Sequence, residues 1–507
     1  MANERYDFVV IGSGFAGSIM SMILRRLGKS VLMVEQGSHP RFAIGESSTP
    51  FANLLLEKIA ADYDLPFLRD LSEWGSWQEK HPNLGVGLKR GFSFFHHSLG
   101  ERTDFADRNR QLLVAASPND RVADTHWYRP DFDSFLVKQA IETGVVFTDL
   151  TKVRAFAERG NGWQIDLLRA GKSTIVETDF IIDASGGNSE FANRFAGARE
   201  DFKVMPPTMG VWAHFRSVKR QDETESFFAS SLPPYPVDDA AVHHVFPGGW
   251  IWVLRFNNGI TSAGAAFQKG TDLDGKTPEE TWSKVLENFP SVKEIFTDAQ
   301  AVTSFYESSQ LSFRRARIAG ANWALLPSAA GFVDPLLSTG FALTLLGIVR
   351  LADAFSGGRW TLDSYAEVTL GELDATADLV SALYAKMHSP KEFNLLTLLY
   401  FAAVSFTETA WRLGKPELAS SFLLGNNENI CRGRSKLCAV ARAGGAITQE
   451  AVASTIATYD IAGLGDFRRA NWYPVDFNDL VANSHKVQAS DAELERLFKK
   501  LKISVDL

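Results

Sequence analysis

The sequence predicts an α/β protein that has an N-terminal Rossmann-type fold, an inserted antiparallel β-sheet and a C-terminal helical region. Three observations support this prediction. A strand, a glycine-rich turn, a helix and a second strand follow one another between residues 6 and 35. Short apolar strands separated by turn residues occupy residues 210–267. Beyond Ser338 the pattern is mostly helical to the end of the chain.

Composition narrows the functional classes. The chain has 507 residues, 45% hydrophobic and 22% charged, which is typical of a globular protein with several domains. A net charge of −8 argues against nucleic acid as a partner. Two cysteines, and histidines without ligand spacing, predict no metal site. Residues 395–406 form an apolar stretch too short to cross a bilayer, and the N-terminus lacks a secretory pattern, so we expect no membrane span and a cytoplasmic location.

The first unit reads as two buried parallel strands joined by a helix. Residues 6–11 form the first apolar strand, and a helical stretch extends to about Leu27. Residues 30–34 form the second strand, which Glu35 closes. Such a unit predicts a doubly wound α/β domain.

The turn inside this unit carries a full GxGxxG motif that predicts a dinucleotide site. Gly12 permits the tight turn, Gly14 lets the backbone approach a pyrophosphate, and Gly17 lets helix and strand pack closely. Ala16 lies in the same turn, whose helix N-terminus offers N–H groups to phosphates. Glu35 stands where a carboxylate accepts hydrogen bonds from ribose hydroxyls. The motif alone fits both NAD and FAD, and its position at the N-terminus favours FAD.

The remaining elements suggest how the chain is divided. Further predicted elements are a hairpin at 162–168 and 173–177, strands at 180–183, 210–218, 241–246, 250–256, 260–267 and 322–326, and a charged amphipathic helix at 491–501. We predict a first part of the FAD-binding domain at 1–200, an antiparallel-sheet substrate region at 201–300, a return segment of the FAD-binding domain at 301–360 and a helical C-terminal region at 361–507.

Five segments suggest a family. They are the glycine-rich turn, PRFAIGES at 40–47, GLKRGFSF at 87–94, WIWV at 250–253 and GFVDPLLSTG at 331–340. Together they resemble the flavin-dependent halogenases, within the larger superfamily of FAD monooxygenases and geranylgeranyl reductases, and they are most similar to the phenol halogenases. Two features depart from the pattern. Leu254 and Arg255 replace the Ile-Pro that follows the tryptophan motif, and Pro327 and Ser328 replace a Gly-Asp pair.

The resemblance implies an oxidoreductase that uses FADH2, O2 and chloride or bromide to make hypohalous acid. Backbone amides of Thr339 and Gly340, at the entrance of a helix, would hold the halide, since such N–H groups bind anions. The alternative is a plain helix cap. Phe341 would lie against the flavin, and Arg129 would contact it. Asp334 is the candidate that replaces the missing flavin-contacting carboxylate.

Lys89 is the candidate catalytic residue that the resemblance implies. A buried lysine can hydrogen-bond hypohalous acid, or form a haloamine if burial lowers its pKa. The strand-like pattern at 86–95 predicts that Lys89 and Arg90 point to opposite faces. Trp250 and Trp252 share one strand face, either as a wall between substrate and flavin or as ordinary core residues.

The predicted substrate is a small electron-rich phenol, because Leu337 stands where tryptophan halogenases carry a glutamate that assists attack on indole. A separate flavin reductase would supply FADH2. Three alternatives stay open: an aromatic hydroxylase or prenyl-chain reductase on the same fold, a halogenase for carrier-protein-tethered substrates, and a flavoprotein-like binding module without catalysis.

Overall fold

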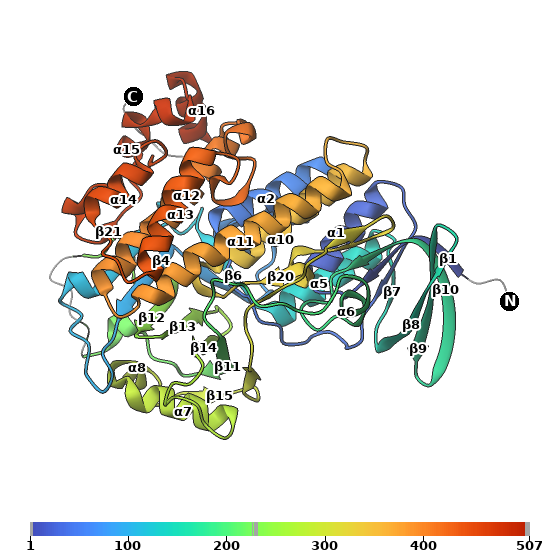
Figure 1. The fold of residues 1–507 in the computed structure, drawn as a ribbon, viewed down its shortest axis with the longest axis horizontal. Helices are drawn as coiled ribbons and strands as arrows, with labels where there is room; N and C mark the ends of the chain where they lie inside the picture. The colour runs from blue at the N-terminus through green and yellow to red at the C-terminus, as the bar shows by residue number, and fades with distance from the viewer. Residues whose placement is uncertain (1–3, 226, 228–231, 502–507) are drawn as a thin grey trace.

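The computed structural model describes residues 4–225, 227 and 232–501, and it confirms the predicted α/β class (Figure 1). Parallel strands build the first sheet around β1 (Glu4–Ile11). This strand pairs with β2 (Val31–Val34) on one side and β10 (Lys172–Asp183) on the other. Beyond them lie β7 (Val146–Thr148) and β19 (Trp323–Leu325), also parallel. Strand β2 is buried along its whole length, which agrees with its unbroken apolar sequence.

The predicted hairpin is present, but its second arm is longer than expected. Strand β9 (Gly162–Arg169) pairs antiparallel with the first half of β10. The second half of β10 continues into the parallel sheet without a break, so the arm at 173–177 and the predicted strand at 180–183 are one strand. Strand β8 (Thr151–Arg159) completes this outer ribbon, seen at the right of Figure 1.

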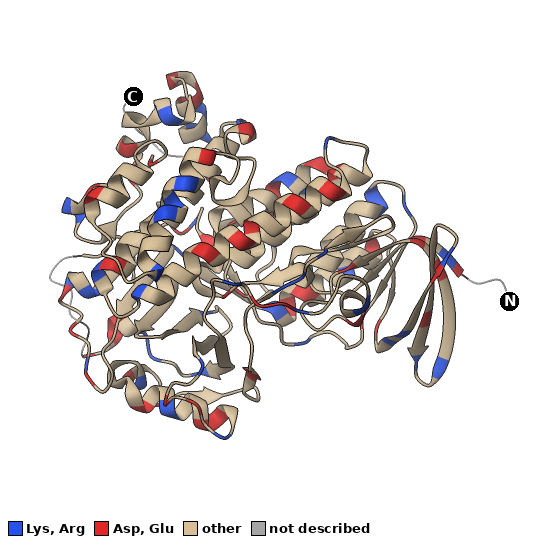
Figure 2. Cartoon of the chain, viewed as in Figure 1, with Lys and Arg blue, Asp and Glu red and all other residues tan. Residues whose placement is uncertain are grey.

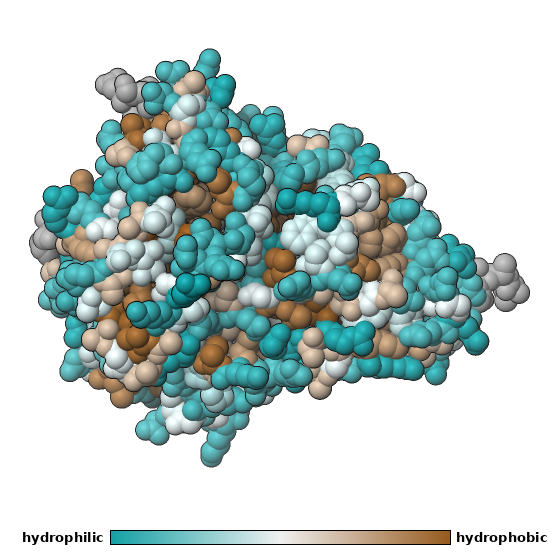
Figure 3. All heavy atoms as spheres, turned by 45° about the horizontal axis from the view of Figure 1, so that its top comes forward, coloured by the Kyte–Doolittle hydropathy of each residue, from teal (hydrophilic) through white to brown (hydrophobic). Residues whose placement is uncertain are grey.

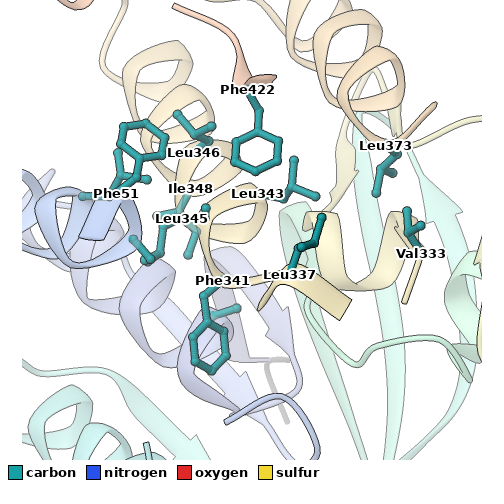
Figure 4. Packing of buried hydrophobic residues seen from close by; sticks show 14 of the residues in the cluster. Phe51, Val333, Leu337, Phe341, Leu343, Leu345, Leu346, Ile348, Leu373 and Phe422 are labelled. Atoms are coloured by element: carbon teal, nitrogen blue, oxygen red, sulfur yellow. The ribbon is translucent and has the colours of Figure 1, made fainter. Parts of the chain in front are cut away.

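Helices cover the parallel sheet and bring the late part of the chain back to it. Helix α10 (Thr339–Phe355) packs against α1 (Phe15–Arg26), α2 (Pro50–Asp62) and α11 (Leu362–Lys386). Figure 4 shows leucine and isoleucine side chains of α10 gathered between α2 and the segment that carries Phe422, while the Phe341 side chain lies apart at the start of the helix.

Within the part of the chain that the structure describes, two apolar segments are long enough to cross a membrane by length and composition alone. One runs from Leu336 to Phe355, and the other is α12 (Pro390–Arg412). In each, 78% of the apolar window is buried inside the protein. Both therefore serve as core helices here, as we expected for residues 395–406.

The second sheet gathers strands from distant parts of the chain. Its order is β15 (Gln300–Ala301), β11 (Thr208–Arg216), β14 (Thr261–Gln268), β13 (Gly249–Arg255), β12 (Ala241–Phe246), β4 (Gly91–His96), β5 (Gln111–Ala115) and β21 (Trp472–Tyr473), with β16 (Tyr306–Ser308) also on β11. Most pairs are antiparallel, as predicted for the middle of the chain. Two are parallel, β12 with β4 and β21 with β5, because these partners come from separate chain segments.

The predicted strand at 86–95 is two strands in two sheets, which corrects our expectation. Strand β3 (Val86–Lys89) pairs with β6 (Asp124–Trp127) in a small separate sheet. The chain then crosses at Arg90, whose N–H donates to the carbonyl of Asp239, and continues as β4 in the large sheet. This crossing places the last residue of β3 between the two sheets.

The C-terminal region is helical, as expected. It contains α13 (Glu428–Arg442), α14 (Gln449–Ile456), α15 (Phe477–Ala482) and α16 (Asp491–Leu501). In Figure 2, the charged residues along α11 are mostly acidic, and those along α13 are mostly basic. In the face of Figure 3, hydrophilic residues surround small apolar patches.

Candidate active site

The glycine-rich turn forms a close-packed cradle between β1 and α1. Gly12 has φ +97°, and a Cβ atom there would lie 2.8 Å from the carbonyl oxygen of Ala184. A Cβ atom on Gly17 would lie 2.0 Å from the carbonyl oxygen of Gly12. Gly14 caps α1 without a side-chain hydrogen bond, so N–H groups of the first turn stay available. Only glycine fits at positions 12 and 17, as the motif predicts for the tight turn and for the close packing of helix and strand.

The Glu35 carboxylate lies beside this turn at the end of β2. It accepts hydrogen bonds from the backbone and hydroxyl of Ser13, each at 3.1 Å, and from the backbone of Gly37 at 2.9 Å. Burial favours its neutral form, but Arg41, 3.2 Å away, and these N–H groups outweigh burial and lower the pKa of Glu35. An ionised acceptor thus stands where the sequence predicts ribose recognition.

Arg129 fastens the PRFAIGES segment, which we call the strap (residues 40–47), to the rest of the site. Its guanidinium pairs with Asp133 through two contacts of 2.8 Å. It also donates to the carbonyl oxygens of Ile44 at 3.1 Å and Gly45 at 2.9 Å. The strap therefore stays close to α5 (Arg129–Glu142).

A cavity of about 440 Å³, here called the cofactor cavity, joins these elements. Its walls include Gly14, Ala16, Arg41, Arg129, Asp334, Thr339, Gly340 and Phe341. A glycine cradle, a helix N-terminus and an ionised carboxylate are the donor and acceptor set that a dinucleotide needs. The residues present thus fit FAD. We predicted no role for Arg41 from the sequence. Its position in the strap, close to the glycine-rich turn, was the feature that could have indicated a role at the cofactor site.

A strained turn precedes α10 and exposes its first N–H groups. Leu337 and Ser338 both have left-handed backbone, with φ values of 70° and 55°. Such non-glycine residues cost roughly 1–2 kcal/mol each, so packing must hold them. Ser338 precedes the helix without capping it through its side chain. The N–H groups of Thr339 and Gly340 are therefore not covered by the cap that we considered as the alternative.

Asp334 lines the cofactor cavity and also a second, smaller cavity described below, and its carboxylate accepts three hydrogen bonds. It accepts from the backbone of Leu336 at 2.9 Å, from Nε1 of Trp250 at 3.2 Å and from the hydroxyl of Tyr384 at 2.9 Å. Burial raises the pKa of Asp334 to about 6, although these bonds oppose the shift. The residue thus holds both the strained turn and Trp250 in place.

A second cavity of about 70 Å³, here called the halide cavity, adjoins the cofactor cavity. It is lined by strap residues including Ser47, by His243, Trp250, Trp252 and Leu254, and by the turn from Asp334 to Phe341. The centroids of the Trp250 and Trp252 rings lie 5.6 Å apart, and both residues line this cavity and are buried. The two interpretations from the sequence, a wall between substrate and flavin and ordinary core residues, both stay open. Burial lowers the pKa of His243 to about 3. The described residues contain no group of three or more potential metal-ligating side chains.

Lys89 ends β3 with its side chain fully buried. Its Nζ donates to the hydroxyl of Ser47 at 2.9 Å and to the carbonyl oxygen of Ser48 at 2.5 Å, and it lies 3.8 Å from the centroid of the Phe92 ring. Burial lowers the pKa of Lys89 to about 7, although the charge of Asp124 across the strand pair opposes the shift. An amine in this state is partly neutral near pH 7.

The side chains of Lys89 and Arg90 have different surroundings, although Arg90 lies at the break after β3 and not within one continuous strand as predicted. Its side chain reaches the surface and pairs with Asp120 at 2.7 Å. The guanidinium of Arg90 therefore has a charged partner at the surface, whereas the amine of Lys89 is buried.

A third cavity, of about 180 Å³, lies on the other side of Lys89; we call it the aromatic cavity. Thr49, next to Ser48, and Phe92, under the Lys89 amine, are part of its wall. Other lining residues are Phe51, Val114, Tyr400, Phe401, Val404, Glu408, Arg412, Leu464, Tyr473 and Phe477. Lys89 itself lines neither cavity, but its amine contacts one lining residue of each, Ser47 of the halide cavity and Phe92 of the aromatic cavity. Sequence reasoning missed the α12 and C-terminal residues, which carry no motif.

Comparisons with known proteins were made on both sequence and structure. The family model described as tryptophan halogenase matches residues 117–392, more than half of the chain. Monodechloroaminopyrrolnitrin halogenase PrnC of Pseudomonas fluorescens is 29% identical over 398 residues, 75% of this chain and 68% of the relative. Tetracycline 7-halogenase of Kitasatospora aureofaciens is 28% identical over 349 residues, 67% of this chain and 61% of the relative.

Solved structures share the fold. Halogenase PltM, solved in complex with phloroglucinol and FAD, superimposes with a TM-score of 0.82 at 23% identity, covering 92% of this chain and 99% of that one. Flavin-dependent brominase Bmp2 superimposes with a TM-score of 0.61 at 23% identity, covering 87% and 98%.

Proposed function

The chain belongs to the tryptophan halogenase family of flavin-dependent halogenases, and from this premise we propose that it halogenates a small electron-rich phenol through Lys89. One observation carries the proposal: the buried Lys89 amine donates to Ser47, which lines the halide cavity, and lies over the ring of Phe92, which lines the aromatic cavity. A separate flavin reductase is proposed as the source of reduced flavin.

The cofactor is FAD, held by the glycine turn, Glu35 and Arg129. Bound reduced FAD would supply, from O2 and halide, hypohalous acid. The uncapped N–H groups of Thr339 and Gly340 would attract the halide, because a helix N-terminus carries partial positive charge. Trp250 would keep organic substrate out of the halide cavity.

Lys89 would transfer the halogen. Its neutral amine nitrogen attacks the halogen of hypohalous acid, so an N–halogen bond forms while the oxygen–halogen bond breaks. The departing hydroxide takes a proton from the nitrogen and becomes water. A ring carbon then attacks the halogen, the electron pair of the N–halogen bond returns to the amine, and the amine takes the ring proton. The lowered pKa of Lys89 supports this role, since only the neutral amine is a nucleophile.

Leu337 supports a phenol over an indole as the substrate. Its side chain is buried and apolar, so it offers no carboxylate to a cationic ring intermediate. A phenol supplies electron density from its own oxygen. Two relatives are named as halogenases of a pyrrole-2-carbonyl group on a peptidyl-carrier protein, which keeps a tethered substrate as the second candidate.

Product mass tests this proposal. The holoenzyme is supplied with reduced FAD, O2 and bromide, and is offered resorcinol, indole, free tryptophan and carrier-bound pyrrole in separate reactions. We expect the two-isotope bromine signature on the phenol. Oxygenated products without bromine would contradict the proposal and favour a hydroxylase, and bromination of the carrier-bound pyrrole alone would favour the tethered substrate.

A further inference from the structure

The aromatic cavity contains a carboxylate that the halogen-transfer chemistry does not use. Its wall is mostly apolar, but Glu73, Glu408 and Asp476 also line it. The Asp476 side chain caps α15 by accepting from the backbone of Asn478 at 2.9 Å. Burial, together with the nearby charge of Glu57, raises the pKa of Glu73. Glu408 differs from both because its carboxylate forms an ion pair with the guanidinium of Arg412.

The Glu408 side chain is fixed by Arg412 one helical turn further along α12. Nε of Arg412 donates to Oε1 of Glu408 at 2.7 Å, and its other end pairs with Glu57 at 3.4 Å. Both members are largely buried, with 21% and 13% of their side chains exposed. No described residue donates a hydrogen bond to Oε2 of Glu408, and Glu408 is one of the residues that line the aromatic cavity.

One face of α12 connects this carboxylate to the reaction centre. Phe401, Val404, Ser405, Glu408 and Arg412 all line the aromatic cavity. The ring of Phe401 lies 5.0 Å from that of Phe92, on which the Lys89 amine rests. Glu408 lies seven positions after Phe401, which is about 10 Å along a helix. The cavity thus has a reactive end and an anchoring end.

We propose that Glu408 is a specificity-determining residue that accepts a hydrogen bond from a hydroxyl or arylamine N–H on the substrate ring; this rests on the proposed function. An ionised carboxylate accepts hydrogen bonds and donates none, so a ring that carries only ether oxygens gains nothing from it. Because Arg412 donates to Oε1 of Glu408, the carboxylate group is held in one orientation, and the direction of Oε2 is therefore fixed. When the hydroxyl or N–H of the substrate is bound to Glu408, the opposite edge of the substrate ring faces Lys89.

Binding of two matched probes to the oxidised FAD holoenzyme tests this inference without any chemistry. Resorcinol carries two donors, whereas 1,3-dimethoxybenzene has the same ring and none. We expect resorcinol to bind the parent enzyme roughly 10- to 100-fold more tightly, the range for a hydrogen bond to a charged group. We expect Glu408→Gln to lose most of this ratio, because its amide is a weaker acceptor. Glu428→Gln on the surface of α13 is the matched control and should keep the ratio.

The outcomes separate the two proposals. If the parent enzyme brominates resorcinol but binds both probes equally, or if Glu408→Gln keeps the full ratio, the role of Glu408 is wrong and the proposed function stands. If the parent brominates no phenol or arylamine, the proposed function fails, and this inference with it. FAD content and thermal unfolding show whether Glu408→Gln is folded. If it is not, the comparison of the two probes on the parent enzyme decides alone.

Discussion

The Nζ atom of Lys89 lies 2.9 Å from the hydroxyl oxygen of Ser47, so the proposed halogen carrier contacts the strap that lines the cofactor cavity. The two residues come from separate elements, and the bridge between Ser47 and His126 fixes their distance. A shift of the strap would therefore move the acceptor that orients the amine.

Replacing Ser47 by alanine should slow halogenation without removing FAD. The variant loses one of two hydrogen-bond acceptors of Lys89, while the strap keeps its bond to Arg129 through Gly45. A hydrogen bond of a neutral group commonly contributes about 0.5–1.5 kcal/mol, so we expect kcat to fall by about two- to tenfold. Initial rates with saturating phenol measure it, and Ser47→Thr should restore much of the rate. An unchanged kcat would show that Ser47 does not orient the amine.

Stability should rise with pH because of Lys89. Its pKa is about 7 in the folded protein and 10.5 as the ordinary value, so between these limits the unfolded chain binds a proton that the folded chain does not. Taken alone, this group increases the free energy of unfolding by about 1.4 kcal/mol per pH unit in this window, whereas burial raises the pKa of Asp124, which contributes a slope of the opposite sign in both proteins. Urea unfolding at pH 7, 8 and 9 measures the slope for the parent and for Lys89→Met. Equal slopes in the two proteins would contradict the buried, low-pKa lysine.

Gly17→Ala should abolish FAD binding. The new Cβ atom would lie 2.0 Å from the carbonyl oxygen of Gly12, so the turn must open and the first helical N–H groups must move. The matched control is Gly371→Ala in α11, where a Cβ meets nothing within 4 Å. This control should keep FAD and gain up to about 1 kcal/mol of stability from helix propensity. Flavin absorbance of the purified variants measures the result, and FAD bound at parent levels by Gly17→Ala would refute the cradle.

Free tryptophan should be a poor substrate. The position that would carry an assisting carboxylate is occupied by buried Leu337, so a cationic indole intermediate lacks a nearby negative charge. We expect an equimolar mixture of resorcinol and tryptophan with reduced FAD and bromide to yield brominated phenol almost exclusively. Efficient bromination of tryptophan with the phenol untouched would overturn the substrate assignment.

The sequence predicted the cradle well because its chemistry is local. Gly12 and Gly17 are the residues that fit their positions, and Glu35 falls at the strand end where the βαβ unit places it. The prediction that Lys89 and Arg90 point to opposite faces followed from alternation along a strand, and the choice of Lys89 as the buried residue followed from the family resemblance. The break at Arg90 did not, since the two halves pair with strands from different parts of the chain.

The aromatic cavity could not be predicted in this way. Glu408 and Arg412 show ordinary helical spacing that usually marks a surface ion pair, and only the packing of α12 against Phe92 and the C-terminal segment encloses them. Likewise, Asp334 was predicted to contact the flavin from its position in a motif. The structure adds its bonds to Trp250 and Tyr384, which no sequence pattern indicates.

Halogenation by Lys89→Met tests the central claim most directly. Methionine fills a similar volume but has no amine, so the fold and the FAD site should persist. With reduced FAD, O2, bromide and resorcinol, we predict normal FAD content and continued O2 consumption, with product formation reduced by on the order of 10²-fold or more. Bromination by Lys89→Met at the rate of the parent enzyme would contradict the account.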